Sequence, residues 1–183
     1  MKKTIITALV FLSAISLNAQ KYFTKNATIT FVSKAPMETI EGTNKTTTAV
    51  IDATSGAIAF SVVVKGFVFD QQLLQQHFNE NYMESDKFPK GEFKGSITNN
   101  ASVKYATDGS YAVTVSGKLT IHGVTKDATS TGKITVSGGK ISASSEFSIT
   151  LSDYNISIPS VVKDKISKTV KITMNTGNMD KLK

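Results

Sequence analysis

Apolar and polar side chains alternate most strictly between Tyr111 and Ile121. The odd-numbered positions carry Tyr, Val, Val, Gly, Leu and Ile, and the even-numbered positions carry Ala, Thr, Ser, Lys and Thr. Because successive side chains of a strand point to opposite faces, this pattern predicts a long strand with one dry and one wet face. His122-Gly123 then reverses the chain, and a second strand leaves from Val124. Such hairpins are typical of antiparallel sandwiches and barrels.

The same period of two recurs along most of the chain and predicts about eight strands. Residues 70–89 differ, because they contain no β-branched residue and carry an apolar side built from Leu73, Leu74 and Phe78. We expect one or two short helical turns there, lying across the end or mouth of the sheet. Gly42 and Asn44 mark a turn or bulge inside the second β-prone stretch. The predicted strands are 27–34, 38–43 with 45–52, 57–65, 91–103, 111–121, 124–137, 140–151 and 169–176.

The fold class that follows is all-β, an eight-stranded antiparallel barrel with one short helical segment. Eight strands can close around one small ligand. The presumed inward positions mix large residues (Phe93, Leu119 and Phe147) with small ones, which would leave a dry cavity suited to a hydrocarbon chain. The alternative is a packed sandwich in which the small residues flank bulky neighbours, and the pattern leaves both open. The small residues are Gly95, Gly117, Ala128, Ser130, Gly132, Ala143 and Ser145.

The first residues read as a targeting segment rather than as part of the fold. Lys2 and Lys3 precede an apolar run from Ile5 to Leu17, and the small residue Ala19 follows. This arrangement predicts a signal peptide over residues 1–19, cleaved near Ala19, and one domain over residues 20–183. We therefore expect a periplasmic or secreted protein, which reaches stability without disulfides because the sequence has no Cys.

The charge is basic, at +7, but all 21 basic residues are Lys. Recognition of phosphate or guanine by a bidentate fork requires Arg, so we expect no nucleic-acid partner. The lysines are scattered along alternating strands, which is typical of a solvated outer face. A weak, transient contact with anionic membrane surfaces remains open, as does homodimer formation.

Candidate chemistry is sparse. His77 and His122 are the two histidines, and without Cys they cannot complete a closed structural zinc site, so we expect no metal. We expect His122 to be a solvent-exposed turn residue and His77 to lie at a rim or near a ligand headgroup. Glu84 and Asp86 are interpreted as a solvated or capping pair. The sequence has no nucleophile elbow and no phosphate loop, so no catalytic residue and no enzyme activity are expected.

Two blocks of the sequence carry a family resemblance. The first is His77-Phe78 followed by residues 82–89 (YMESDKFP) and 93–95 (FKG), and the second is residues 117–126 (GKLTIHGVTK). Together they resemble the YceI family. The resemblance implies a lipocalin-like, eight-stranded barrel with a short helix and an elongated apolar tunnel for a polyisoprenoid or similar lipid. It also implies a small periplasmic or secreted protein and brings no family-wide catalytic motif.

The leading hypothesis is an exported protein that sequesters or transports an isoprenoid or another long-chain amphiphilic lipid. No cofactor is expected beyond a bound polyisoprenoid or prenyl quinone. His77 is the candidate headgroup or rim residue. The predicted tunnel lining is Phe31, Phe60, Phe67, Phe69, Leu73, Phe78, Tyr82, Phe93, Ile97, Val113, Val115, Leu119 and Phe147.

Two alternatives belong to other classes. An eight-stranded outer-membrane barrel would place apolar residues outward with aromatic girdles, whereas here the aromatics share a face with small residues. A lipid-modifying enzyme could use the same tunnel, with His77 and Glu84 as its least improbable acid–base pair.

Overall fold

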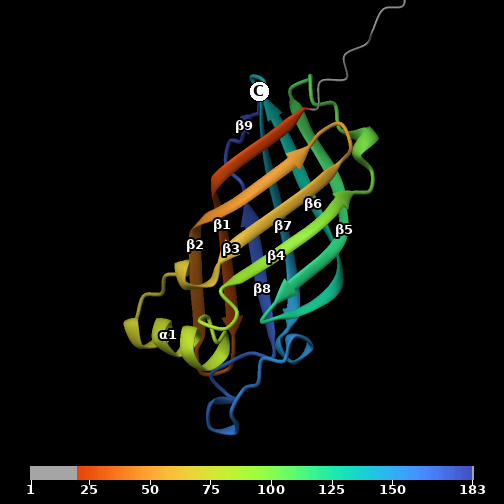
Figure 1. Ribbon diagram of the computed structural model, residues 1–183. Coiled ribbons are helices and arrows are strands. Elements are labelled where there is room, and N and C mark those ends of the chain that lie inside the picture. Colours follow the sequence, from red (N-terminus) through yellow and green to blue (C-terminus); the bar gives the residue numbers. More distant parts are fainter. Residues whose placement is uncertain (1–19, 183) are drawn as a thin grey trace, which may run out of the picture.

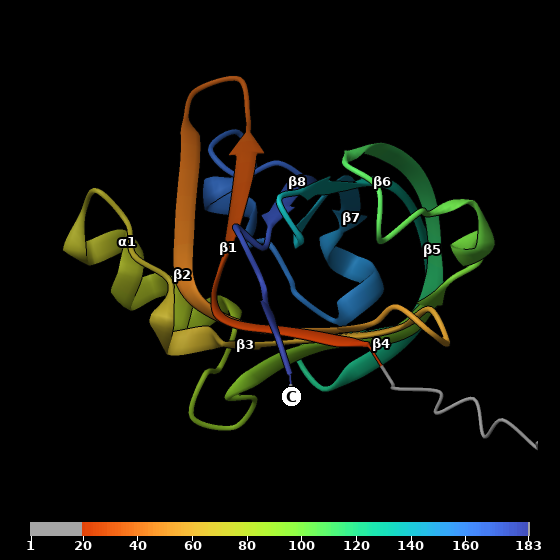
Figure 2. The ribbon, with the colours of Figure 1, turned by 90° about the horizontal axis from the view of Figure 1, so that it is seen from above.

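The predicted alternation produces one antiparallel sheet that closes on itself (Figures 1 and 2). The computed structural model describes residues 20–182, so the predicted signal peptide lies outside the described residues. The sheet order is β2-β3-β4-β5-β6-β7-β8-β1, and pairing of β1 with β2 completes the barrel. The predicted eight-stranded antiparallel barrel is confirmed. Its strands are β1 (Lys21–Lys34), β2 (Thr39–Asp52), β3 (Ala57–Val63), β4 (Lys90–Ile97), β5 (Gly109–Ile121), β6 (Val124–Ser137), β7 (Lys140–Thr150) and β8 (Thr169–Asn175), and the two-residue β9 (Asp180–Lys181) pairs with the start of β1.

The helical segment forms where the strand pattern lapses. Helix α1 (Gln72–His77) continues into a π turn, η2 (Phe78–Tyr82), and lies at one end of the barrel (Figure 1). The remaining helical pieces are short 3₁₀ turns: η1 (Val64–Gly66), η3 (Asn100–Ser102), η4 (Leu151–Tyr154) and η5 (Ser160–Val162). None of the helices between residues 20 and 182 is both long and apolar enough to span a bilayer.

Several predicted strands differ from the structure by one or two residues at an end, and three differ more clearly. The first strand begins at Lys21 rather than at residue 27. The stretch interrupted at Asn44 is one continuous strand, β2, with an irregular register opposite Ala27 rather than a turn. The strand predicted over residues 91–103 ends at Ile97, so its second half was predicted wrongly. Asn99 and Asn100 explain this early end, because their side chains bond to the backbone of neighbouring segments, at Thr114 N–H (2.9 Å) and at the Ala53 carbonyl (2.9 Å). Asparagine side chains that replace ladder bonds in this way favour turns.

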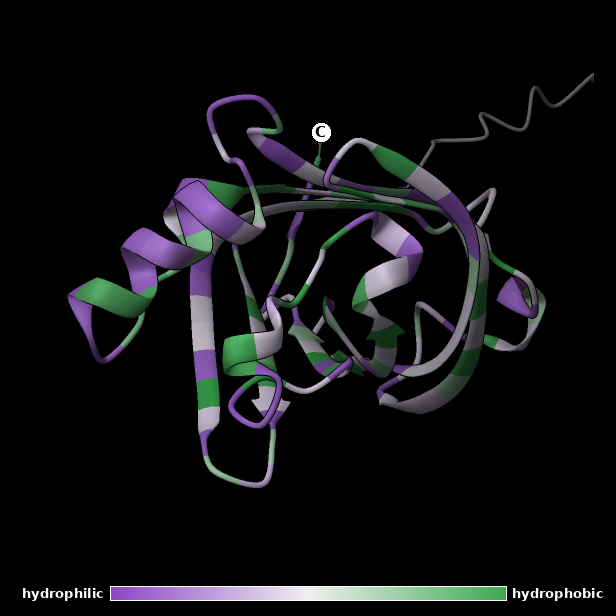
Figure 3. Cartoon of the chain, turned by 90° about the horizontal axis from the view of Figure 1, so that it is seen from below, coloured by the Kyte–Doolittle hydropathy of each residue, from purple (hydrophilic) through white to green (hydrophobic). Residues whose placement is uncertain are grey.

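The two ends of the barrel differ. The packed end carries β9, the β2–β3 turn and the β6–β7 turn, and a cluster of buried side chains fills it. The open end carries α1, the β1–β2 turn and the loop that precedes β8 (Figure 1). Alternating hydrophobic and hydrophilic positions run along the strands of the wall (Figure 3). The most completely buried members of the packed end are Ala27, Ala49, Ile51, Ile134, Val136, Ile141 and Met179.

The wall is split over part of its height between β6 and β7. Ladder pairing joins Gly132–Ser137 to Lys140–Ser145, whereas residues 124–131 and 146–150 fall outside it. Tyr154 and Ile156, which follow β7, are buried against Leu119. The segment after β7 therefore packs where the two strands diverge.

Candidate functional site

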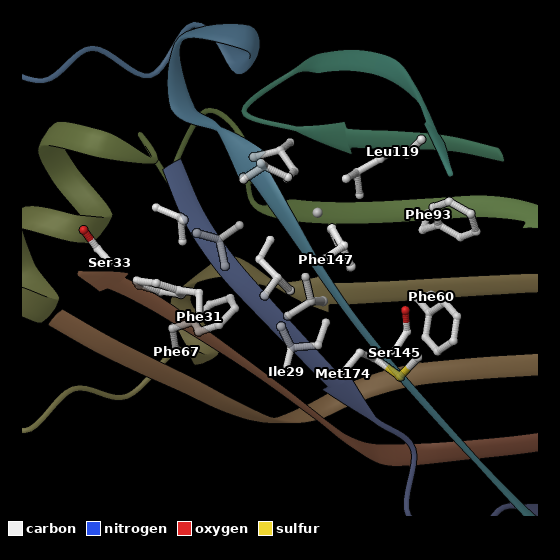
Figure 4. Close-up of a pocket in the computed structure, with 18 of the residues that line it drawn as sticks. Ile29, Phe31, Ser33, Phe60, Phe67, Phe93, Leu119, Ser145, Phe147 and Met174 are labelled. Atoms are coloured by element: carbon white, nitrogen blue, oxygen red, sulfur yellow. The ribbon is translucent and has the colours of Figure 1, made fainter. Parts of the chain in front are cut away.

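An apolar cavity of about 530 Å³ occupies the barrel, with residues of all eight long strands on its wall. Side chains such as Phe31 from β1, Phe93 from β4 and Phe147 from β7 point into the same space (Figure 4). Ile51, Ile97 and Ile134 form its floor, because they line the cavity and also belong to the buried cluster of the packed end. The volume is typical of pockets that enclose a small organic ligand.

Four of the large aromatic residues on the cavity wall face inward but are incompletely buried. Phe31, Phe60, Phe93 and Phe147 are all only half-buried, although they lie on the inner face of the barrel. Ile134, one floor residue, has only 1% of its surface exposed. The difference arises because part of the surface of each wall residue borders empty space rather than other side chains. Their free apolar surface is what a ligand could cover.

Four phenylalanines form an aromatic cluster at the open end of the cavity. Phe78 from η2 stacks on Phe31 of β1 at a centroid distance of 5.3 Å, and it contacts Phe69 at 5.0 Å and Phe67 at 5.5 Å. All four line the cavity. The cluster fixes the helical segment against the barrel with contacts that are characteristic of aromatic pairs.

The small inward residues play two roles. A side chain at Gly95 or Gly117 would collide with the facing backbone and would lie 2.8 Å from Cζ of Phe93. These two glycines therefore let β4 and β5 approach under the Phe93 ring and create no empty space. Ala128, Ser130, Gly132, Ala143 and Ser145 do line the cavity. The cavity, rather than the packed sandwich, is the correct alternative, but only part of the small-residue set produces it.

The cavity reaches the surface at the open end, which we call the mouth. Gln71, His77 and Lys165 are exposed residues on its wall, and Glu38 is a half-buried one. They come from the segment leading into α1, from α1 itself, from the loop before β8 and from the β1–β2 turn. His77, the predicted rim residue, thus lies at the mouth, and its contact with a headgroup stays a prediction.

All thirteen predicted lining residues lie on the cavity wall, from Phe31 on β1 to Phe147 on β7. Their contact with a ligand stays a prediction. The list missed further lining residues of two kinds, some on the strands and some in the segments between them. Ile172 and Met174 of β8 line the wall, and their alternation in the predicted last strand was a usable signal. Val162 ends the short 3₁₀ turn η5 and Ile166 lies in the loop after it, where no periodic pattern marks an inward residue.

One polar spot interrupts the apolar wall where β6 and β7 diverge. The hydroxyls of Ser130 and Ser145 lie 2.8 Å apart, and Ser145 Oγ donates to the Thr131 carbonyl at 2.8 Å. Both serines line the cavity. The two hydroxyls hydrogen-bond to each other and to the backbone, so these polar groups have protein partners at the place where β6 and β7 separate.

His122 is not the exposed turn residue that the sequence predicted. Only 9% of its side chain is exposed, and Nε2 lies 2.9 Å from Glu84 Oε2. Nδ1 lies 3.1 Å from the Tyr154 carbonyl oxygen, and the ring packs edge-on against Phe88 at 4.6 Å. The prediction was wrong because the β5–β6 turn folds against two other segments of the open end.

These contacts also change the interpretation of the acidic residues. Glu84 pairs with His122, so the hypothetical pair of His77 with Glu84 is not formed. Asp86 instead pairs with Lys65 of η1 at 2.5 Å, and both side chains are exposed. Glu84 and Asp86 therefore serve separate contacts that tie the loop after η2 to the barrel.

Burial affects the tyrosines of the open end. Desolvation raises the pKa of Tyr82, which lines the cavity, and that of Tyr154, with a smaller contribution from Asp153. Both phenols therefore stay neutral over the physiological range, and the wall gains no charge from them.

Comparisons with known proteins agree with this architecture. The family profile described as YceI-like domain matches residues 21–177. No curated protein matches the chain.

Solved structures share the fold. A polyisoprenoid binding domain from Saccharophagus degradans, described as implicated in plant cell wall breakdown, has a TM-score of 0.77 at 14% identity, covering 90% of this chain and 99% of that chain. BcnA from Burkholderia cenocepacia has a TM-score of 0.67 at 18% identity, covering 84% and 96%. The YceI protein of Campylobacter jejuni has a TM-score of 0.58 at 20% identity, covering 78% and 84%.

Proposed function

The chain belongs to the family of YceI-like domains, and on that basis we propose that it binds the chain of an isoprenoid or another long-chain amphiphilic lipid inside its barrel. The protein then sequesters or transports this lipid. The observation that carries the proposal is the apolar cavity of about 530 Å³ with half-buried aromatic residues on its wall.

The free apolar surface of the wall provides the binding energy for a lipid chain. Each buried methylene contributes about 0.8 kcal/mol, so affinity rises with the length of chain that the cavity encloses. Phe31, Phe60 and Phe147 offer apolar surface that has no protein partner. A branched isoprenoid chain suits a wall that mixes such rings with the small residues Ala128, Gly132 and Ala143.

The ligand class follows from chemistry and from likeness. One structural neighbour is described as a polyisoprenoid binding domain, which makes a polyprenol the first ligand to test. A prenyl quinone is the second, because its chain is the same and its headgroup could lie among the polar residues of the mouth. His77 is the proposed headgroup contact there.

Binding is proposed without chemical conversion of the lipid. The serine hydroxyls on the wall bond to each other and to backbone oxygens, and Glu84 is held by His122 rather than by His77. One structural neighbour is described as a polyisoprenoid binding domain, which supports the same assignment.

Export is part of the proposal. The basic and apolar pattern of residues 1–19 supports a periplasmic or secreted location. Fractionation of cells that express the full chain tests this, with N-terminal sequencing of the mature protein. We expect a start near Gln20 and recovery in the fraction released without detergent, whereas recovery only with detergent would favour an outer-membrane barrel.

Ligand binding is tested by native mass spectrometry of the purified protein and by mass spectrometry of its organic extract. We expect an adduct that the extract identifies as an isoprenoid or acyl lipid. Protein that has been stripped of lipid should then bind an added fluorescent polyprenol with one-to-one stoichiometry. Empty extracts together with no binding of polyprenol or prenyl quinone would contradict the proposal.

A further inference from the structure

Two loops at the open end project beyond the mouth of the cavity, and we call them the docking loops. They are residues 34–38, which include the β1–β2 turn, and residues 159–168, which precede β8 (Figure 1). The Met37 N–H donates to the Asp164 carbonyl at 3.0 Å, and the Ser167 N–H donates to Ser33 Oγ at 2.9 Å. The two loops therefore form one surface.

The docking loops display the two most exposed large apolar side chains of the described residues. Val161 is 88% exposed and Met37 is 71% exposed. Their immediate neighbours behave oppositely, because Val162 and Glu38 are half-buried and line the cavity. Each loop thus holds one side chain on the cavity wall and turns the adjacent apolar one outward.

Charge surrounds these apolar tips. The docking loops carry four lysines (Lys34, Lys163, Lys165 and Lys168) and two acids (Glu38 and Asp164). All four lysines are exposed, and none is in an ion pair with another residue of the range 20–182. Exposed apolar tips flanked by flexible cations are the arrangement with which peripheral proteins enter the headgroup region of an anionic membrane.

We propose that the docking loops bind the surface of an anionic lipid bilayer and hold the mouth of the cavity against it. This inference rests on the proposed function, since it supplies the route by which a lipid chain passes between membrane and barrel. Val161 and Met37 insert among the headgroups, while Lys163, Lys165 and Lys168 contact anionic lipids. The chain of the ligand then crosses a short apolar path, without passing through bulk water.

The surface is confined to these two loops, because α1 on the other side of the mouth has acidic neighbours. Asp70 precedes α1 and Glu80 lies in the turn that follows it. α1 does present an exposed apolar side chain, Leu73 at 59%, but these carboxylates lie close to it in the sequence. A surface that included α1 would bring these carboxylates toward anionic headgroups, so the barrel should tilt toward the docking loops.

The experiment compares flotation of the protein with vesicles of phosphatidylcholine alone and with vesicles that contain about 30% phosphatidylglycerol. The test variants are M37D/V161D and K163Q/K165Q/K168Q. Matched controls at the packed end are L182D, whose side chain is 45% exposed, and K104Q/K140Q/K181Q, whose lysines are exposed and form no ion pair with another residue between 20 and 182.

We expect the wild-type protein to float with the anionic vesicles and to be released by high salt. Each lysine near such a surface contributes about fivefold in partitioning, so K163Q/K165Q/K168Q should lose at least about tenfold. M37D/V161D should lose a similar factor, because it replaces two inserting apolar side chains with carboxylates that the anionic surface repels. Both controls should keep wild-type partitioning. Transfer of a fluorescent polyprenol from the vesicles should slow by a similar factor in the test variants. Equal flotation of wild type and test variants would overturn the inference, and so would flotation lost equally in the controls.

A second measurement separates this inference from the proposed function. Fluorescent polyprenol delivered from ethanol, without vesicles, reports affinity for the cavity alone. Normal affinity with no vesicle flotation would overturn the docking surface and leave the proposed function standing. Flotation that depends on Met37 and Val161, in a protein that binds no polyprenol, would support the docking surface while contradicting the proposed function.

Discussion

The two ends of this barrel are built from the same alternating strands, but buried side chains fill one end and a cavity occupies the other. At the packed end, Ile134, Ile141 and Met179 are each at most 1% exposed, and a continuous cluster fills the space. At the open end, Phe31 and Ile172 also face inward but remain half-buried beside the cavity. Alternation therefore sets the direction of a side chain, whereas neighbouring segments decide whether it is covered.

The segments that make the difference lie between the strands. The packed end is closed by the chain between β4 and β5 and by Met179, whose N–H donates to the Ile141 carbonyl at 2.8 Å. At the open end, α1 and the docking loops lie around the mouth without sealing it. The packed end therefore supplies stability, and the open end supplies free apolar surface. Mutations at the two ends should separate these properties.

The largest contrast is expected from removing matched isoleucines. Ile141→Ala at the packed end should lower the free energy of unfolding by about 3 kcal/mol, because it opens a cavity in a filled cluster. Ile172→Ala should cost less than about 1.5 kcal/mol, since it only widens an existing cavity, but it should weaken polyprenol binding. Urea unfolding of the ligand-free proteins measures both. Equal losses of stability would remove the distinction between the ends.

Enlarging matched valines should give the next largest effect. Val136 at the packed end is 2% exposed, so Val136→Phe should cost about 1–3 kcal/mol by overpacking. Val115 lines the cavity, so Val115→Phe should fold with nearly wild-type stability while lowering polyprenol affinity by at least about tenfold. Titration with fluorescent polyprenol checks this. Unchanged affinity in a folded Val115→Phe protein would mean that the ligand does not occupy this part of the cavity.

Alkaline pH should weaken the packed end through Tyr105. Burial raises the pKa of Tyr105 to about 12, and Tyr22 and Asp52 contribute in the same direction. Between pH 10 and about 12 the folded protein keeps this proton while the unfolded chain loses it, so stability should fall as pH rises through that window. Tyr105→Phe should flatten this fall, although it loses the 2.8 Å bond to Asn100 Oδ1 and about 1 kcal/mol at neutral pH. An unchanged alkaline slope in this variant, measured by urea unfolding, would contradict the assignment.

The smallest effect is expected at Asp52, in the β2–β3 turn of the packed end. Backbone N–H groups of Ser55 and Thr54 donate to its carboxylate, at 3.1 and 2.9 Å, and lower its pKa below 3.8. This stability is present above pH 3.8 and is lost as pH falls through the lower pKa of the folded state. Asp52→Asn should therefore make acid unfolding slightly less dependent on pH. A steeper dependence of stability on pH in Asp52→Asn would contradict this role of the carboxylate.

The sequence predicted most of the barrel because alternation is a local property. Residues 111–121 showed which side chains of β5 face inward, and Val113, Val115 and Leu119 do line the cavity. The helical segment was predicted from the lapse of β-branched residues, and α1 lies at the mouth as expected. The family resemblance is confirmed by the match over residues 21–177.

What the sequence could not predict depends on contacts between distant segments. His122 looks like any turn residue until Glu84 and Tyr154 are placed beside it. Gly117 seems to open space, but a neighbouring strand and Phe93 occupy it. Val162 lines the cavity from the short 3₁₀ turn η5, which is too short for a period to separate inward from outward residues.

The most direct test of the central claim is a set of isotope-filtered NMR measurements between a methyl-labelled protein and an unlabelled polyprenol. We expect intermolecular contacts to the methyl groups of Val115, Leu119 and Ile172, and none to those of Val136 and Ile141. Contacts confined to methyl groups on the outer surface, or a ligand that reaches Ile141, would contradict a barrel that is filled at one end and receives a lipid chain at the other.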